Sequence, residues 1–212
     1  MINVQRQPEP ADFDEKVRKP GLKYLKLAGK TGKIDWKSPK ATVWRNCRNE
    51  LYAAYKGLCC YVAMHISPST VNKNDLYSAS VEHFIPKSQR PELAYEWSNY
   101  RLASRKANSD RQTKSVLDPF LVKNDWFELE LFSGEVNPNP TLPKNLLSKV
   151  INTINNLNLN DYHWKKLRVK YFTNYNLAIK NANTEEEVLI AQKYLKEFAP
   201  IVYQAMIKQG IL

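Results

Sequence analysis

The chain has 212 residues, of which 43% are hydrophobic, and it carries a formal net charge of +11. This length and composition exclude a wholly disordered chain and allow a real hydrophobic core, in one domain or in one domain with an appended helical part. The excess of 32 Lys and Arg over 21 Asp and Glu favours contact with a polyanion such as nucleic acid, because neutralising phosphates releases counterions.

Several features of the sequence predict a cytoplasmic protein that is not inserted in a membrane. No stretch is long and apolar enough to cross a bilayer, and the opening residues MINVQRQPEP lack the apolar centre of a signal peptide. Cys59 and Cys60 are adjacent and Cys47 stands alone, which is a poor disulfide framework. We therefore expect a cytoplasmic protein with free buried thiols and no membrane partner.

The first 66 residues predict little regular structure apart from one helix. Residues 1–40 are basic and rich in proline, so we expect irregular structure with at most a short helix near 13–17. Residues 41–58 predict a helix, because apolar residues recur every three or four positions from Trp44 to Leu58. The run 59–66 is almost continuously apolar and fits either a buried strand or a buried turn.

The last third of the chain predicts one strand followed by helices. Residues 126–132 alternate as a strand does, and a breaker follows at 137–140. Three helices are expected around 146–157, 164–175 and 188–198. Thr184 and Glu187 form a capping-box pair before the third helix, and Pro200 should break or kink it. We divide the chain into a basic segment (1–40), a core with its preceding helix (41–125) and a C-terminal helical part with a short strand (126–212).

The middle of the chain combines polar residues that are hard to explain by packing alone. Residues 81–85 predict a strand, residues 95–102 a second extended segment, and residues from 104 onward a helix. In such a strand–loop–strand–helix unit the helix can return to the first strand. That return would bring Asn108 beside Glu82 and His83.

These residue types suit the hydrolysis of a phosphodiester. Histidine is the side chain whose ordinary pKa suits deprotonation of water near neutral pH. Mg²⁺ prefers oxygen ligands, which a Glu carboxylate and an Asn amide supply, and it keeps waters for its remaining positions. A second asparagine, Asn99, can fix the orientation of the imidazole of His83.

Together with EHFIPKS, LAYEWSNYRLA and VLDPF, these residues resemble the HNH, or ββα-metal, endonuclease family in its His-Asn-Asn form. The resemblance covers about a fifth of the chain and extends to the HNH subunit of Septu-type bacterial anti-phage systems. It implies an α+β fold in which a ββα-metal core carries an N-terminal helix and a C-terminal helical extension. It also implies cleavage to 5′-phosphate and 3′-hydroxyl ends, with DNA favoured and RNA left open, in a defence system with an ATPase partner subunit.

The resemblance assigns a role to each motif residue. His83 would be the general base, Glu82 and Asn108 would hold one divalent metal ion, Mg²⁺ or Mn²⁺, and Asn99 would orient His83 and tie the loop. The family usually has Asp where this chain has Glu82. Many members also bind a structural zinc through four cysteines, but only Cys59 is present, and the other slots are Val62, Ser104 and Ala107. We therefore expect no structural zinc.

Several alternatives stay open. The basic residues around the motif are candidate phosphate contacts or simply solvated charges: Lys87, Arg101, Arg105, Arg111 and Lys114. His65, His163 and Asp118 are weaker candidates for the site, while Tyr95 and Trp97 are favoured as core residues over platforms for base stacking. The chain could instead be a catalytically idle nucleic-acid-binding module, or a scaffold whose C-terminal helices bind a partner. It has no G-x-x-x-x-G-K-[ST] loop, so any nucleotide sensing would come from another protein.

Overall fold

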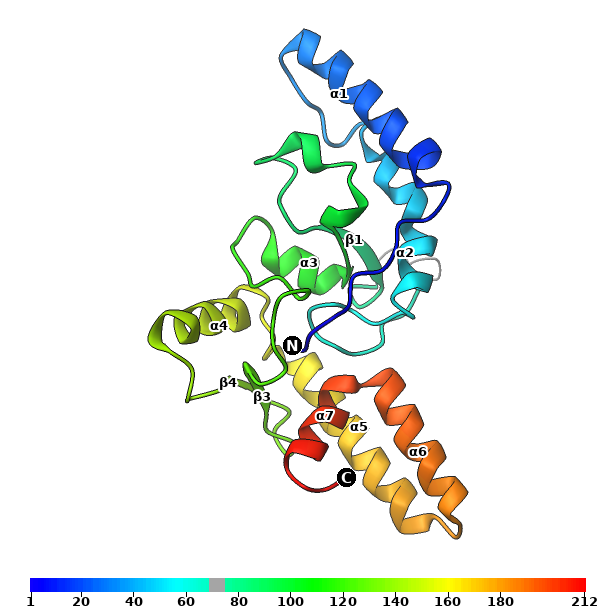
Figure 1. Ribbon diagram of the computed structural model, residues 1–212, viewed down its shortest axis with the longest axis vertical. Coiled ribbons are helices and arrows are strands. Elements are labelled where there is room, and N and C mark those ends of the chain that lie inside the picture. The colour runs from blue at the N-terminus through cyan, green and yellow to red at the C-terminus, as the bar shows by residue number, and fades with distance from the viewer. Residues whose placement is uncertain (69–74) are drawn as a thin grey trace. The chain divides into compact units, whose positions relative to one another are not determined.

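The computed structural model describes residues 1–68 and 75–212 and mixes helices with two small antiparallel sheets (Figure 1). The chain forms two compact units, each of which is described by itself. The N-terminal unit comprises Gln5–Cys59 and Ile66–Asn108, and the C-terminal unit comprises Met1–Val4, Cys60–His65 and Ser109–Leu212. Within the described residues, no helix has the length and apolar character needed to cross a membrane.

The N-terminal unit opens with a long helical stretch, so the prediction of irregular structure was wrong there. A π-helical segment, η1 (Asp14–Arg18), leads directly into α1 (Lys19–Thr31). Pro20 lies in the first turn of α1, where a missing N–H is tolerated. The carbonyl of Lys16 in η1 also accepts a hydrogen bond from Nδ2 of Asn46 at 3.2 Å.

A glycine in α1 is one reason why the local sequence did not predict this helix. Gly21 lowers helix propensity, but a Cβ at this position would lie 2.2 Å from the ring of Tyr95. The missing side chain therefore allows α1 to pack directly on that buried ring. Tertiary packing has overridden local propensity at this position.

The predicted helix at 41–58 forms in a shorter version. It consists of a 3₁₀ segment, η2 (Thr42–Cys47), and of α2 (Arg48–Ala54). The chain then turns through Lys56 and Gly57, both of which have positive φ. The apolar run that follows forms buried turns, which was one of the two expected outcomes.

The centre of the N-terminal unit is an antiparallel pair of strands followed by a helix. Strand β1 (Ala79–His83) pairs with β2 (Tyr100–Ser104), and α3 (Arg105–Arg111) follows directly. Two 3₁₀ turns, η3 (Pro91–Leu93) and η4 (Trp97–Asn99), lie in the connection between the strands. Helix α2 packs against both strands. The predicted order of strand, loop, strand and helix is confirmed, with β1 at 79–83 in place of 81–85 and β2 at 100–104 in place of 95–102.

The C-terminal unit contains a small hairpin and four helices. Strand β3 (Phe127–Leu129) pairs with β4 (Val136–Pro138), so the predicted breaker is wrong at its first two residues. Proline is tolerated in β4 because both strands of a two-stranded sheet are edge strands. The three predicted helices are confirmed as α4 (Lys144–Asn156), α5 (Tyr162–Asn181) and α6 (Glu185–Phe198), and α5 and α6 form a helical hairpin (Figure 1).

The two boundary signals of α6 are also confirmed. The side chain of Thr184 accepts the N–H of Glu187, and the carboxylate of Glu187 accepts the N–H of Thr184, which is a complete capping box. At the other end, the chain breaks at Ala199 and a separate helix, α7 (Pro200–Lys208), begins with Pro200.

Candidate active site

The start of α3 is held against the segment that enters β1. The first N–H groups of a helix have no partner within the helix. Here the N–H of Arg105 donates to the carbonyl of Ser78 at 2.9 Å, and the N–H of Lys106 donates to the carbonyl of Leu76 at 2.6 Å. Ser104 caps the helix, since its Oγ accepts the N–H of Ala107 at 3.1 Å. These bonds return α3 to the beginning of β1.

Asn108 lies one turn into α3 and contacts β1, as predicted, but its partners are Ser80 and Val81 and not the expected Glu82 and His83. Its Nδ2 lies 3.2 Å from Oγ of Ser80 and 3.4 Å from the carbonyl oxygen of Val81. Because a carbonyl oxygen only accepts, the Val81 contact determines which end of the carboxamide is the amino group. Among the described residues, Oδ1 of Asn108 has no hydrogen-bond partner. Side chains alternate along a strand, so Ser80 and Glu82 leave β1 on the same face.

Glu82 stands directly opposite Arg101 in the strand register, and both side chains are almost completely buried. The Nη1 group of Arg101 donates to the carbonyls of Ser98 and Tyr100, both at 2.9 Å. Its guanidinium carbon lies 4.7 Å from the centroid of the Phe84 ring. Arg101 therefore differs from the exposed phosphate contact that the sequence suggested. It is a buried cation that contacts the backbone and an aromatic ring.

His83 ends β1, and only 7% of it is exposed. Its Nε2 lies 2.9 Å from the carbonyl oxygen of Ala94. Since this oxygen can only accept, Nε2 carries the proton in the neutral imidazole and the lone pair lies on Nδ1. The edges of Trp44 and Tyr100 meet the ring with centroid distances of 4.9 and 5.2 Å. Packing holds the ring, and the hydrogen bond to Ala94 sets its tautomer.

Asn99 closes the loop between the strands. Its Oδ1 accepts the N–H of Ile85 at 2.7 Å, while its Nδ2 donates to the carbonyls of Ile85 at 3.0 Å and Leu93 at 3.1 Å. The bond that orients His83 comes from the carbonyl of Ala94, the residue after Leu93. Asn99 therefore ties the loop, as predicted, and its link to His83 runs through the loop backbone at Leu93 and Ala94.

Lys87 lies between two indole rings near the motif. Its Nζ is 5.2 Å from the ring centroid of Trp44 and 5.9 Å from that of Trp36. Burial lowers the pKa of Lys87, the charge of Glu82 opposes this effect, and Arg45 adds to it. Lys87, Glu82 and Arg45 therefore share one electrostatic neighbourhood.

Two arginines that the sequence analysis did not single out extend this neighbourhood. Burial lowers the pKa of Arg48, and the charges of Arg105 and Arg45 lower it further. Arg45 belongs to η2, Arg48 begins α2 and Arg105 begins α3. We call these three residues the arginine cluster. The spacing of Arg45 and Arg48, one helical turn apart, was the available sequence signal.

The remaining basic candidates lie in the C-terminal unit. Arg111 is 2% exposed, so it also differs from an exposed phosphate contact. Lys114 is exposed, and its Nζ donates to the carbonyl of Asp110 at 2.8 Å. Only Lys87 and Arg105, of the five predicted phosphate contacts, combine partial exposure with a place beside the motif.

The three weaker candidates, His65, His163 and Asp118, make contacts that stabilise the fold. The ring of His65 packs on Phe198 with a centroid distance of 4.8 Å, and the ring of His163 packs on Trp164 at 5.2 Å. Oδ1 of Asp118 accepts the N–H of Phe120 at 3.0 Å and holds a turn. In the N-terminal unit, the thiol of Cys59 accepts the N–H of Ser104 at 3.4 Å. Tyr95 and Trp97 are buried, as predicted for core residues.

The donor set suits a magnesium-like ion better than zinc. The described residues contain no group of three or more His, Cys, Asp or Glu side chains that could hold a metal ion. Glu82 and Asn108 offer one carboxylate and one amide oxygen, both hard ligands. Mg²⁺ is commonly held by so few protein oxygens because it retains waters and binds substrate phosphates.

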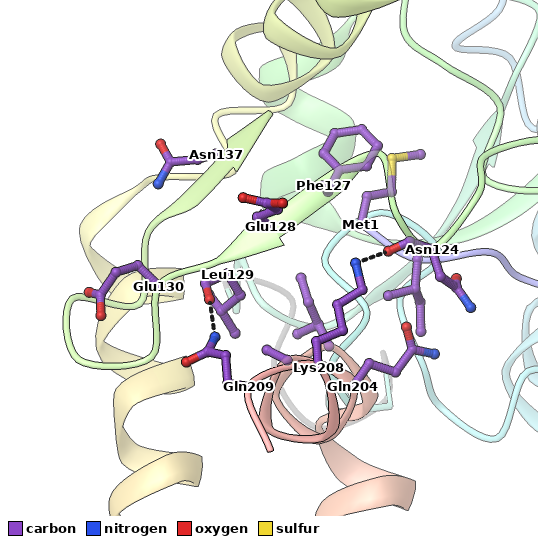
Figure 2. A pocket seen from close by; sticks show the side chains of 13 residues that line it. Met1, Asn124, Phe127, Glu128, Leu129, Glu130, Asn137, Gln204, Lys208 and Gln209 are labelled. Atoms are coloured by element: carbon purple, nitrogen blue, oxygen red, sulfur yellow. Dashed lines mark hydrogen bonds between the residues drawn. The ribbon is translucent and has the colours of Figure 1, made fainter. Parts of the chain in front are cut away.

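A cleft of about 490 Å³ in the C-terminal unit provides a second place for a ligand (Figure 2). Glu128 and Asn137 face each other across β3 and β4, and Gln204 and Lys208 line the cleft from α7. Nζ of Lys208 donates to the carbonyl of Asn124 at 2.8 Å. Its acidic lining residues are Glu128 and Glu130, and none of the site residues predicted from the sequence lies in this cleft.

Comparison with protein-family models and with curated proteins finds no match to this chain. The HNH resemblance therefore stays a prediction, and its support is the local geometry of β1, β2 and α3.

Proposed function

We propose that the chain is a metal-dependent HNH endonuclease that hydrolyses nucleic-acid phosphodiesters, with DNA the favoured substrate. The observation that carries this proposal is the state of the Asn108 carboxamide. Its amino group is bound to β1 and its oxygen is left without a partner among the described residues, on the face that also carries Glu82. Asn108 is half-buried, and an amide oxygen held at the surface by its own amino group is placed to accept a cation or the waters around one.

The geometry of His83 supports the same chemistry. With Nε2 bound to Ala94, the lone pair of Nδ1 can accept a proton from water. Successive residues on a strand point to opposite faces, so Glu82 and His83 leave the end of β1 in different directions. In-line attack on phosphorus requires the nucleophile and the leaving oxygen on opposite sides. A phosphate at the end of β1 could have His83 on one side and Glu82 with Asn108 on the other.

In this mechanism His83 takes the proton of the attacking water, and Ala94 and Asn99 keep the imidazole in place. Glu82 and Asn108 would hold a divalent cation, which when bound neutralises charge on the phosphate and the leaving oxygen. Lys87 and the arginine cluster would hold the flanking phosphates.

The test is cleavage of plasmid DNA and of RNA with Mg²⁺ or Mn²⁺, beside His83→Ala and Asn108→Ala. Removal of a general base costs about 10²–10⁴-fold in rate, so both variants should be nearly inactive yet still bind DNA in EDTA. His163→Ala is the matched control, because this histidine is also packed on an indole ring but lies in α5. Cleavage that survives in His83→Ala would refute the assignment, and binding without cleavage in any metal would favour an idle binding module.

A partner subunit is the second part of the proposal. The resemblance implies an ATPase, and the α5–α6 hairpin has exposed apolar side chains, Leu189 and Ile190 at 63% and 61% exposure, that favour burial against another protein. Cleavage assays should therefore be repeated with the candidate ATPase and ATP. If the isolated chain is fully active and the candidate ATPase does not change its rate, the proposed partner is wrong. The nuclease assignment would then still stand.

A further inference from the structure

The loop between α1 and η2 places an indole ring near the candidate active site. The ring centroid of Trp36 lies 6.2 Å from that of Trp44, which in turn lies 4.9 Å from that of His83. The rings of Trp36 and His83 are thus no more than about 11 Å apart. Lys87 contacts both indoles. Trp36 therefore belongs to the surroundings of the site, although it is far from the motif in sequence.

The turn that carries Trp36 is held by hydrogen bonds of Asp35 on one side and of Lys37 and Ser38 on the other. The hydroxyl of Tyr24 donates to the carbonyl of Asp35 at 2.8 Å and accepts the N–H of Asp35 at 2.9 Å. Oδ1 of Asp35 accepts the N–H of Lys37 at 2.9 Å, and its carbonyl accepts the N–H of Ser38 at 3.2 Å. Both sides of Trp36 are therefore tied down, so little conformational entropy would be lost on ligand binding.

Part of the Trp36 side chain remains accessible in the folded chain. It is half-buried, and its indole N–H donates to no described residue. Exposed lysines flank it at positions 33, 37 and 40. A partly exposed indole among lysines is the combination with which proteins bind single-stranded nucleic acid, because the ring stacks on a base while the cations follow the phosphates.

We propose that Trp36 stacks on an unpaired nucleobase next to the scissile phosphate, which makes single-stranded or locally unpaired nucleic acid the preferred ligand of this site. The inference rests on the proposed nuclease function for the position of the phosphate. Bases inside a duplex are already stacked on each other and cannot offer a free face to the ring. Stacking uses the face of the base and not the sugar, so unpaired DNA and unpaired RNA share this chemistry.

The test compares Trp36→Leu with Trp36→Phe, because both substitutions keep an apolar side chain but only Phe keeps a ring. Binding of fluorescein-labelled single-stranded and duplex oligonucleotides is measured by anisotropy in EDTA, where no cleavage takes place. Trp36→Leu should weaken single-strand binding by about tenfold, a loss that changes little with salt, while Trp36→Phe should keep most of the affinity. Duplex binding should be unaffected by either substitution.

The matched control is Trp126→Leu, which changes a half-buried tryptophan in the C-terminal unit. Single-stranded RNA is run in parallel, and a Trp36-dependent loss with either strand supports stacking and identifies the backbone that the site accepts. Equal losses for single strands and duplex, or unchanged single-strand affinity in Trp36→Leu, would overturn the proposal. Because these assays involve no chemistry, they can fail while His83-dependent cleavage stands, and they can succeed if the protein proves catalytically idle.

Discussion

The carbonyl oxygen of Ala94 accepts two hydrogen bonds, from Nε2 of His83 at 2.9 Å and from the hydroxyl of Tyr100 at 2.8 Å. The two side chains stand opposite each other at the end of the strand pair. A backbone group in the loop thereby sets the protonation pattern of the imidazole, and Asn99 holds the loop that carries this group.

This contact predicts the tautomer of His83. In neutral imidazole, ¹⁵N-resolved NMR spectra should show a protonated Nε2 and an unprotonated Nδ1 for this residue. The chain has three histidines, so the signals that vanish in His83→Ala identify the ring. A dominant Nδ1–H tautomer would contradict the proposed direction of proton transfer.

Asn108 should be needed for metal binding. Asn108→Ala removes the free amide oxygen and should weaken Mn²⁺ binding, followed by the EPR signal of the free ion, by at least about tenfold. Asn108→Asp keeps an oxygen at this position and should retain more affinity. Ser80→Ala is the control, since it removes one anchor of Asn108 but leaves the contact with Val81. Equal affinity in all variants would place the metal elsewhere.

Asn99 should matter for both stability and activity, and the chain offers a matched comparison. Asn160 binds the N–H and the carbonyl of Val136 with its carboxamide, in the same way as Asn99 binds those of Ile85. Each Asn→Ala change leaves part-buried backbone groups without these partners and should lower the free energy of unfolding, by roughly 2–4 kcal/mol for Asn99. Urea unfolding gives this value.

The two variants should differ in catalysis. Asn99→Ala should also lose cleavage under conditions where the protein is still folded, because the Ala94 carbonyl shifts. Asn160→Ala should keep it. Equal retention of activity in both variants would show that Asn99 has no positioning role.

The arginine cluster should contact phosphates. Replacing Arg45, Arg48 or Arg105 by Gln should each reduce the slope of log K against log salt for nucleic-acid binding by about 0.7–0.9. Arg90→Gln is the control, because this exposed side chain pairs with Glu92. A slope unchanged by all three substitutions would assign the cluster to structure alone.

The buried guanidinium of Arg168 should make the C-terminal unit less stable than an apolar side chain at the same position would. It is 1% exposed, Nη1 donates to the carbonyl of Gly134 at 2.9 Å, and Nε and Nη2 have no partner among the described residues. Buried donors without partners are costly, so Arg168→Met should raise the free energy of unfolding at pH 7 by about 1–3 kcal/mol. Unchanged or lower stability would mean that the guanidinium is compensated.

The same residue predicts a pH dependence. Burial lowers the pKa of Arg168 to about 9, well below its ordinary value of 12.5. Above pH 9 the unfolded chain binds more protons at this residue than the folded chain does, so the stability of the wild type rises with pH. The advantage of Arg168→Met should therefore shrink between pH 8 and 10 in parallel urea titrations. An advantage that is constant over this range would contradict the lowered pKa.

The local pattern of the sequence determined the mixed α and β class, the order β1, β2 and α3, the three long C-terminal helices and the capping box at Thr184. These features depend on periodicity and on contacts between near neighbours, which a sequence displays directly. The return of Asn108 to β1 was also predictable, because a short hairpin followed by a helix allows few other arrangements.

Only the tertiary structure decided which partners complete the site. The orientation of His83 depends on a backbone carbonyl, which no side-chain pattern reveals, and the helix α1 depends on a glycine that fits against Tyr95. Arg101 and Arg111 look like surface cations in the sequence but are buried, while Trp36 and Arg48 are brought near the motif by packing. Burial and long-range proximity arise from the folded chain as a whole, and for that reason local sequence patterns do not determine them.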